Sequence, residues 1–463
     1  MAKQKWVRPE GCPLWFDGKN VNEAMFCQEF LTKHRLLYTE NAFFTVNGRM
    51  VDETPLKSAI YNSVSPYMVT NVSKKIVSII ELLKITAYKS NFNPQEDRIH
   101  VANGTLHLDG TFSEAKDQIV RSRFPVKYNP LAGSPERWLH FLVELLEPDD
   151  ILTLQEFIGY CLIPSTAAQK MMVIKGNGGE GKSQIGTVLA RLFGCNAKDG
   201  SIGKVSENRF ARADLEHILL MIDDDMRLEA LKQTNYVKSI VTAQGKMDLE
   251  KKGKQSYQGY LYARLLAFSN GDLQSLYDRS DGFFRRQLIL TTKEKAPDRT
   301  DDPHIADKLC TELEAIFLWA FDGLKRLAAN NFRFTESKRA IENRNTVRQD
   351  ANNLIAFLDA PDYIRFDPEL SITSEEFYRI YCVWCKENGM TPMKQRSVAD
   401  YLIGHQKQYG IEYSNNHLNY AHRRVRGFRG SLLSFIHRMM RWQDTLKYGP
   451  RIIHLKNNIR RLS

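Results

Sequence analysis

The sequence predicts an α/β protein built around a parallel sheet, and two observations lead to this class. Short apolar runs alternate with helical stretches between residues 171 and 295, as in strands joined by crossover helices. The first run, MMVIK at 171–175, breaks directly into a glycine-rich loop, Gly176 to Gly181, and then into Lys182 and Ser183. A strand, a glycine-rich turn and a helix in this order are typical of α/β folds that hold phosphate groups.

Residues 1–135 are expected to form a mainly helical N-terminal α+β domain. The segments 43–51 and 99–108 each place an Asn-Gly pair between strand-like runs, the strongest short-range signal for a hairpin. Residues 71–88 carry apolar side chains at helical spacing. A Pro- and Gly-rich segment at 127–137, KYNPLAGSPER, predicts the end of this domain.

The second expected domain covers residues 136–350 and contains the parallel sheet. Two amphipathic helices, within 136–146 and 149–163, lead into the strand before the glycine-rich loop. Later strands are expected within 217–222, 260–268 and 286–290, and charged helices within 303–350.

Residues 351–463 are expected to form a winged-helix-like DNA-binding domain with a basic tail. Helical patterns over 374–388 and 394–408 end near Gly389 and Gly410. A basic, strand-like stretch, HRRVRGFRG, follows them. Helices followed by such a hairpin are typical of winged helices.

The net charge of +11 is concentrated at one end of the chain. Residues 421–463 hold eleven Lys or Arg and one acid, Asp444, so they contribute +10. Such a segment favours a polyanionic partner, because neutralised phosphates release condensed counterions. A solvated tail that aids solubility is the alternative interpretation.

Seven scattered cysteines, an odd number, indicate reduced thiols rather than a disulfide framework. Cys382 and Cys385 form the one CxxC, and without a second pair at zinc-finger spacing we expect two half-buried helical cysteines. No run approaches the roughly 20 apolar residues of a membrane helix, and the N-terminus has no signal-peptide core. A cytoplasmic protein with no membrane partner is expected.

The glycine-rich loop fits the pattern GxxxxGK[ST] in the strand-to-helix context that this motif requires. Glycines let backbone N–H groups turn toward phosphate oxygens. Lys182 would reach the β- and γ-phosphates, and Ser183 would ligate Mg²⁺. We therefore expect a nucleoside triphosphate site. Its predicted contacts are Gly176, Asn177, Gly178, Gly179, Glu180, Gly181, Lys182, Ser183 and Gln184.

An acidic triplet, Asp223 to Asp225, directly follows the apolar run at 218–222. In a hydrolytic site, one acid can hold the Mg²⁺ shell while the next orients the attacking water. A solvated turn is the alternative. We choose Asp224 and Asp225 as the catalytic acids, with Asp224 joining Ser183 as a metal ligand.

The third strand ends in Asn270, which could sense the γ-phosphate or be a simple turn residue. The stretch DGFFRR follows and ends in Arg285 and Arg286. These arginines could cap a helix or bind phosphate on the chain's own surface. They could also form an arginine finger for a neighbouring subunit's nucleotide.

The ordered series GNGGEGKS, ILLMIDDD, LEKKGKQ, LLAFSN and DGFFRR resembles the superfamily 3 helicases, a branch of the AAA+ ATPases. It looks most like the phage/plasmid primase–helicase and poxvirus-type members, and the likeness extends over most of residues 95–430. The resemblance implies an AAA+ core that uses ATP and Mg²⁺, with Asp224 and Asp225 as Walker B acids and Asn270 as sensor. It also implies a homo-hexameric ring in which Arg285 or Arg286 acts across the interface.

The same resemblance implies that DLEKKGKQSYQ forms a hairpin projecting into a central pore. Lys251, Lys252 and Lys254 there could follow single-strand phosphates, and Tyr257 could stack on a base. An exposed lysine loop is the alternative. The predicted DNA contacts of the C-terminal domain are Arg423, Arg424, Arg426 and Arg429.

Together these features predict an ATP-dependent replicative DNA helicase of a phage, plasmid or integrated element, acting on single- and double-stranded DNA. The first 95 residues are short for the priming module that family members often carry, so a separate primase or polymerase is an expected partner. An ATP-switched, origin-binding initiator without unwinding activity is the second interpretation, and a small-molecule P-loop kinase the third. The role of the tail, 434–463, stays open between an added DNA-binding helix and an unstructured arm.

Overall fold

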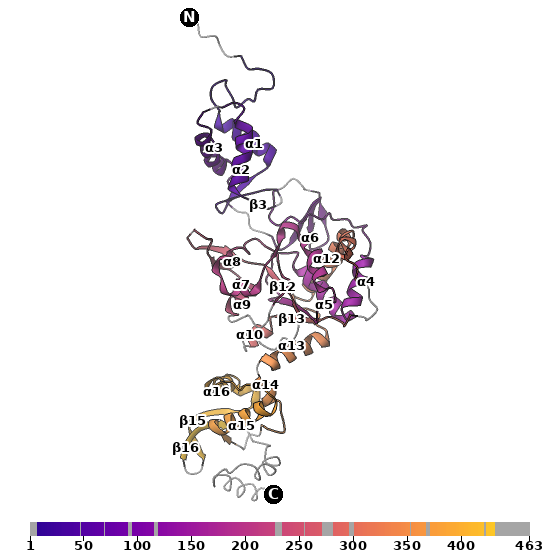
Figure 1. Cartoon of the computed structure of the whole chain (residues 1–463), viewed down its shortest axis with the longest axis vertical. Coiled ribbons are helices and arrows are strands. Elements are labelled where there is room, and N and C mark those ends of the chain that lie inside the picture. The colour runs from indigo at the N-terminus through magenta and orange to yellow at the C-terminus, as the bar shows by residue number, and fades with distance from the viewer. Residues whose placement is uncertain are drawn as a thin grey trace. The chain divides into compact units, whose positions relative to one another are not determined.

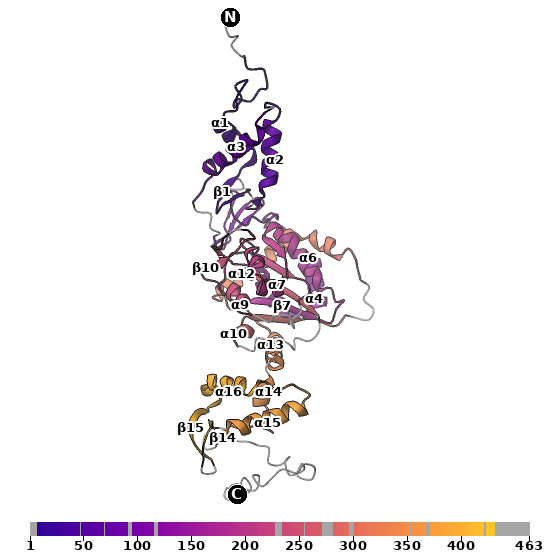
Figure 2. The ribbon, with the colours of Figure 1, turned by 60° about the vertical axis from the view of Figure 1, so that its left-hand side comes forward.

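The computed structural model divides the chain into two compact units, residues 1–344 and 345–463, which are described separately (Figures 1 and 2). It describes all residues except 1–6, 47, 69, 91–94, 115–118, 227–233, 254, 271–280, 296–300, 352, 367–370, 421–422 and 431–463. Side chains are also left out at 281, 347–351, 416–420 and 423–424. The expected tail at 434–463 therefore lies outside the described residues.

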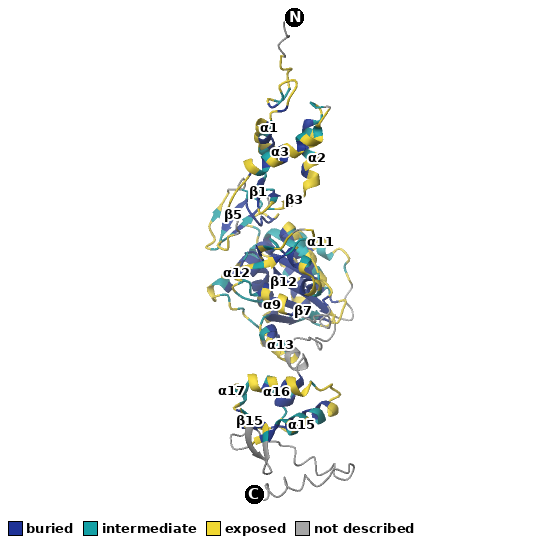
Figure 3. Cartoon of the chain, turned by 90° about the vertical axis from the view of Figure 1, so that its left-hand side faces the viewer, coloured by how far each residue is buried: buried dark blue, intermediate teal, exposed yellow. Residues whose placement is uncertain are grey.

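The first unit is built around a five-stranded sheet in which each neighbouring pair is parallel (Figure 1). In spatial order its strands are β13 (Gln287–Thr291), β7 (Met171–Gly176), β12 (Arg264–Asn270), β9 (Leu220–Asp223) and β8 (Ala197–Asp199). Figure 3 shows β7 and β12 among the buried elements, as strands covered on both faces must be. The expected α/β class with a parallel sheet is confirmed, although the short, polar edge strand β8 is not among the expected strands.

Helices connect and cover these strands. The main ones are α4 (Glu136–Leu145), α5 (Pro148–Tyr160), α6 (Lys182–Phe193), α11 (Ile305–Cys310), α12 (Leu313–Ala329) and α13 (Lys338–Ala351). Shorter elements are η1 (Gly194–Asn196), α7 (Ile202–Glu207), α8 (Arg209–Ala213), α9 (Asn235–Val241) and α10 (Asp281–Phe284), and a hairpin of β10 (Lys246–Leu249) and β11 (Tyr257–Tyr260). Among the described residues, no helix is long and apolar enough to cross a bilayer.

Helix α5 differs from the amphipathic helix that the sequence predicts, because it is buried on nearly all sides. Two glycines let it approach α12 closely. A Cβ on Gly159 would lie 2.3 Å from the Ala320 carbonyl oxygen, and one on Gly323 would lie 2.5 Å from the Gln155 carbonyl oxygen. Backbone contact at this distance excludes any larger residue at either position.

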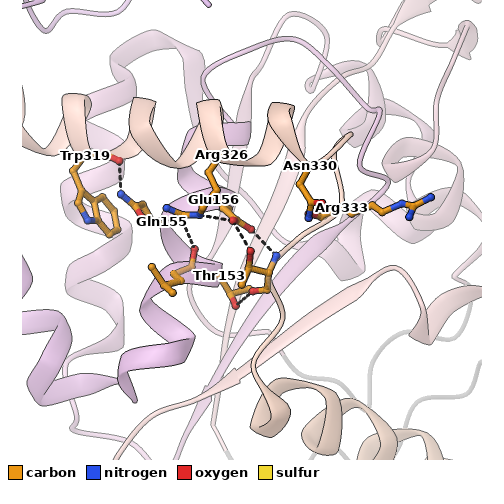
Figure 4. Close-up of polar contacts among 9 residues, drawn as sticks. Thr153, Gln155, Glu156, Trp319, Arg326, Asn330 and Arg333 are labelled. Carbon is orange, nitrogen blue, oxygen red and sulfur yellow. Dashed lines mark hydrogen bonds and ion pairs between the residues drawn. The ribbon is translucent and has the colours of Figure 1, made fainter.

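The polar residues of α5 face partners on α12 and on the segment after it (Figure 4). The fully buried Glu156 carboxylate accepts hydrogen bonds from Arg326 Nε at 2.6 Å and from the Thr335 backbone N–H at 2.7 Å. Gln155 donates to the Trp319 carbonyl at 2.8 Å and accepts from Arg326 at 2.9 Å. These bonds replace the solvent that α5 loses on burial.

The N-terminal part of the first unit contains three helices and two small antiparallel sheets. Its helices are α1 (Glu23–His34), α2 (Glu53–Val64) and α3 (Val72–Thr86). Its strands are β1 (Leu37–Thr39), β2 (Ala42–Phe44), β3 (Met50–Val51), β4 (Arg98–Val101), β5 (Gly104–His107) and β6 (Phe112–Ser113). The antiparallel pair β2–β3 encloses the first Asn-Gly signal, and Gly104 of the second begins β5 in the pair β4–β5, so both hairpin predictions are confirmed.

The second unit packs helices against a three-stranded antiparallel sheet of order β14-β16-β15. Its elements are α14 (Asn353–Leu358), β14 (Ser371–Thr373), α15 (Ser374–Glu387), α16 (Gln395–Gly404), α17 (Gln406–Tyr409), β15 (Glu412–Tyr420) and β16 (Arg423–Arg429). Thr373 and Glu376 form a capping box that starts α15. The helix expected over 394–408 is interrupted at His405, and Gly410 ends α17 in the left-handed region at φ 62°.

Candidate functional site

The glycine-rich loop lies between the end of β7 at Gly176 and the start of α6 at Lys182, next to β12 and β13 in the middle of the sheet. Its residues Gly178, Gly179 and Gly181 have φ of 101°, 82° and 99°, a region that suits glycine. No side chain caps the twelve-residue helix α6 at Gly181. The positive end of this helix therefore faces the loop, where an anion is favoured.

The interior of the loop has room only for a glycine at its first position. A Cβ on Gly176 would lie 2.6 Å from Thr292 Oγ1, 2.7 Å from Lys182 Nζ and 2.9 Å from Glu180 Cδ. A backbone that is free of side chains, beside a lysine and a helix N-terminus, fits the phosphate chain of a nucleoside triphosphate.

Lys182 and Asn270, 88 residues apart, meet at this edge of the sheet. The Lys182 ammonium donates to Asn270 Oδ1 at 2.9 Å, because Asn270 ends β12 directly beside Gly176 in the parallel register. The same ammonium donates to Glu180 Oε2 at 2.8 Å. Two of the predicted site residues are therefore in contact, and a third, Glu180, shares the lysine with them.

Glu180 has a role that the sequence does not predict. Its carboxylate is buried, with 4% of the residue exposed, and it also accepts the Asn177 backbone N–H. Burial alone would raise the pKa of Glu180, but the hydrogen bonds from Lys182 and from backbone N–H groups outweigh it and lower the pKa. The carboxylate is thus ionised and lies inside the loop.

The acidic triplet consists of one buried and two exposed residues. Asp223 is the buried last residue of β9, and its Oδ2 accepts the Ile202 N–H that begins α7 at 2.6 Å. Burial raises the pKa of Asp223, although this hydrogen bond opposes the rise. Asp224 and Asp225 are exposed beyond the strand end. The structure therefore engages Asp223 in a helix cap and leaves the two predicted catalytic acids accessible.

Strand β9 packs one face against α6. A Cβ on Gly186 of α6 would lie 3.3 Å from Ile222 Cγ2, so Ile222 faces this helix. Side chains alternate along a strand, so Asp223 faces away from α6, and Asp224 follows in a turn after the strand end. The other predicted metal ligand, Ser183, is exposed in the first turn of α6. Carboxylate and hydroxyl oxygens at this edge suit Mg²⁺.

Arg285 and Arg286 lie at the opposite end of the strands from the glycine-rich loop of their own chain. The Met171 N–H donates to the Arg286 carbonyl at 2.8 Å, which places both arginines where β7 and β13 begin. The loop follows the far end of β7, about 17 Å away at strand rise. Arg286 donates to the Gly282 carbonyl, whereas Arg285 is exposed.

Two residues that were predicted to contact DNA, Lys251 and Tyr257 of the β10–β11 hairpin, bond to a carboxylate of their own chain. Glu216 Oε2 accepts from Lys251 Nζ at 2.8 Å and from the Tyr257 hydroxyl at 2.6 Å. Lys251 also lies 5.1 Å from the centre of the Tyr257 ring. Lys252 is exposed, and Lys254 lies outside the described residues.

On β16, Arg426 and Arg429 are exposed. The side chains of Arg423 and Arg424 lie outside the described residues.

A polar cluster adjoins this hairpin. Glu40, Glu216 and His217 bring three potential ligand atoms within 4.8 Å of one another. Arg121 Nη2 lies 3.1 Å from Glu40, and Lys251 lies 2.8 Å from Glu216, so both carboxylates already have cationic partners. Burial lowers the pKa of His217, so it meets Glu40 at 3.0 Å as a neutral hydrogen-bond donor. The cluster is charge-balanced without a metal ion.

Comparison with known proteins finds one family model and several solved structures. A model for a family of unknown function (DUF5906) matches residues 174–286, from within β7 to the two arginines. The chain is also similar to three solved structures of the NrS-1 C-terminal region in apo form, at 10% identity and TM-scores of 0.50, 0.49 and 0.48. Each comparison covers 87% of this chain and 98% of the other. At 10% identity, the likeness to the structure with a TM-score of 0.50 concerns the fold alone.

Proposed function

We propose that the chain is an ATP-driven DNA helicase of the superfamily 3 type within the AAA+ class, which serves the replication of a phage, plasmid or integrated element. One observation carries the proposal: Lys182 of the glycine-rich loop and Asn270 of the neighbouring strand are in contact at 2.9 Å. Two accessible acids follow the next strand, β9. This is the arrangement that a triphosphate-hydrolysing site requires.

In this proposal each residue of the site has a distinct task. Lys182 and the loop N–H groups bind the phosphates, and Ser183 with Asp224 would hold Mg²⁺, which supplies charge neutralisation when bound. Asp225 orients the attacking water and accepts its proton. Asn270 positions Lys182 and the water through its amide.

Binding to DNA rests on the hairpin and on the second unit. Lys252 is an exposed cation of the hairpin, next to the Lys251–Tyr257 pair, and suits the phosphates of a single strand. Arg426 and Arg429 present positive charge on β16, which suits a duplex. A separate primase or polymerase would complete replication.

The opposite positions of the loop and the arginines support a ring, which we propose to be a homo-hexamer. Because Arg285 cannot reach the loop of its own chain, any contribution to hydrolysis must come from a neighbouring subunit. An isolated chain would then hydrolyse ATP slowly.

The second candidate is an origin-binding initiator that uses ATP only as an assembly switch. The second unit, with its exposed arginines, would then carry the main function. Protection of a defined origin without strand separation would favour this candidate.

The test is ATP hydrolysis measured with and without single-stranded DNA. We expect strong stimulation by DNA in the wild type and no hydrolysis by Lys182→Ala. An Arg285→Ala/Arg286→Ala variant is mixed with an equal amount of wild type. The total ATPase activity of this mixture should fall below the activity of the wild-type half alone. DNA-independent hydrolysis without such poisoning would exclude the motor.

A further inference from the structure

We propose that Glu180 is an intramolecular substitute for a phosphate group, which occupies the glycine-rich loop until a triphosphate displaces it. The inference rests on the proposed function, since it concerns the same loop. It assigns Glu180 the role of a competitor, in contrast to the direct nucleotide contact that the motif alone predicts.

The contacts of Glu180 are those that a phosphate group would make. One carboxylate oxygen accepts the Asn177 N–H, and the other accepts from the Lys182 ammonium at 2.8 Å. A backbone N–H of the loop and the loop lysine are the donors that hold phosphoryl oxygens in such sites. A carboxylate and a phosphate both offer anionic oxygens, so they compete for these donors.

Burial makes the competition strong. The side chains of Lys182 and Glu180 are 6% and 5% exposed. A buried ammonium without a partner is costly, so the empty loop is stabilised by its own carboxylate. Nothing else in the described residues offers Lys182 a negative charge within hydrogen-bond distance, since Asn270 contributes a neutral amide oxygen.

The Glu180 carboxylate lies on the inner side of the loop, against its lysine. Glu180 Cδ and Lys182 Nζ lie 2.9 Å and 2.7 Å from the position of a Cβ at Gly176. A phosphate group that takes over the Asn177 N–H and the Lys182 donor used by Glu180 would displace the carboxylate toward solvent. Binding then includes the cost of breaking the Glu180–Lys182 pair, and return of Glu180 promotes release of the nucleotide.

The test compares wild type with Glu180→Gln, which keeps the shape of the side chain and removes its charge. Two quantities are measured: the Kd for a fluorescent, non-hydrolysable ATP analogue with Mg²⁺, and the melting temperature of the ligand-free protein. We expect about tenfold tighter binding, because less of the protein is held in the blocked state. We also expect a lower melting temperature, because Lys182 loses its charged partner.

Tighter binding together with a lower melting temperature distinguishes a residue that competes with the nucleotide from one that only supports the loop. Weaker or unchanged binding by Glu180→Gln would overturn the inference. Glu180→Ala serves as a second variant should Glu180→Gln fail to fold, with the same two expectations. Lys182→Ala should lose binding in every background. Wild type that binds no triphosphate would overturn the proposed function as well, whereas wild type that binds normally confines a failure to Glu180.

Discussion

Asn270 connects the strand beside the glycine-rich loop with the lysine of that loop. Its amide oxygen accepts from Lys182, and its backbone is paired with Gly176. In a hydrolytic site the same amide is within reach of the terminal phosphate that Lys182 would hold. A group in this position acts on the reaction more than on binding, because it meets the charge that develops at the transferred phosphate.

We predict that Asn270→Ala lowers the rate of ATP hydrolysis by about 100-fold and changes the affinity for the triphosphate far less. The measurements are kcat under saturating ATP and the Kd of a non-hydrolysable analogue. Ser269→Ala is the matched control, because the Ser269 hydroxyl donates to the Met226 carbonyl at 3.0 Å, away from Lys182. Equal losses of kcat in the two variants would contradict a specific role for Asn270.

The meeting of Lys182 and Asn270 could be anticipated from the sequence, since parallel strands end at a common edge. The Glu180–Lys182 pair could not, because the direction of a side chain in a loop is not encoded in spacing. Glu216 is a similar case. It binds Lys251 and Tyr257, and no local pattern connects residue 216 with a hairpin that begins 30 residues later.

Helices α5 and α12 approach each other closely, and the buried Glu156 of α5 bonds to Arg326 of α12. The fully buried carboxylate accepts from the partly exposed Arg326 and from the exposed Thr335. Hydrogen bonds to a buried charged group contribute more than an exposed ion pair.

We predict that Glu156→Ala lowers the stability of the first unit by about 1.5–3 kcal/mol, because the hydrogen bonds to its buried carboxylate are lost. This loss should appear as a fall of several degrees in melting temperature, measured by scanning calorimetry. Asp322→Ala on α12 is the control: its pair with Lys325 is exposed, so the expected change is at most about 0.5 kcal/mol. Similar shifts in both variants would show that the Glu156 network adds nothing beyond a surface pair.

Element types were predictable wherever periodicity was strong, as in α3, α12 and the strands β7 and β12. The burial of α5 was not, because Gln155 and Glu156 look like a solvent face until α12 covers them. Strand β9 starts at Leu220 instead of His217, since His217 has a left-handed φ of 69° that a strand does not tolerate.

The positive charge of the chain is concentrated in its second unit, so we expect this unit to bind DNA. Arg426 and Arg429 are exposed there, and the sequence from 421 onward carries a charge of +10. Contacts of this kind are recognised by their dependence on salt, because each neutralised phosphate releases counterions.

We predict that Arg426→Ala/Arg429→Ala weakens binding to duplex DNA of any sequence and reduces the slope of log K against log salt by about two. Fluorescence anisotropy over a salt series measures both effects. Lys325→Ala, which removes an exposed cation from the first unit, should leave the slope unchanged. A slope that is identical in all three proteins would place the DNA contacts elsewhere.

The chain separates into compact units at 344/345, inside α13. The domain limit proposed from the sequence at 350/351 stays a prediction. A helix that continues across a boundary offers no glycine, proline or change of composition to mark it. The proposed limit at 135/136 stays a prediction.

In the ring that we propose, the opposite positions of the loop and Arg285 give each subunit two different contact surfaces. In the proposed ring, subunits meet head to tail, so the arginine end of one copy lies at the loop end of the next. Every subunit in such an assembly is a donor on one side and an acceptor on the other. An open row of copies leaves one subunit whose loop receives no arginine from a neighbour. Closure into a ring completes that last site.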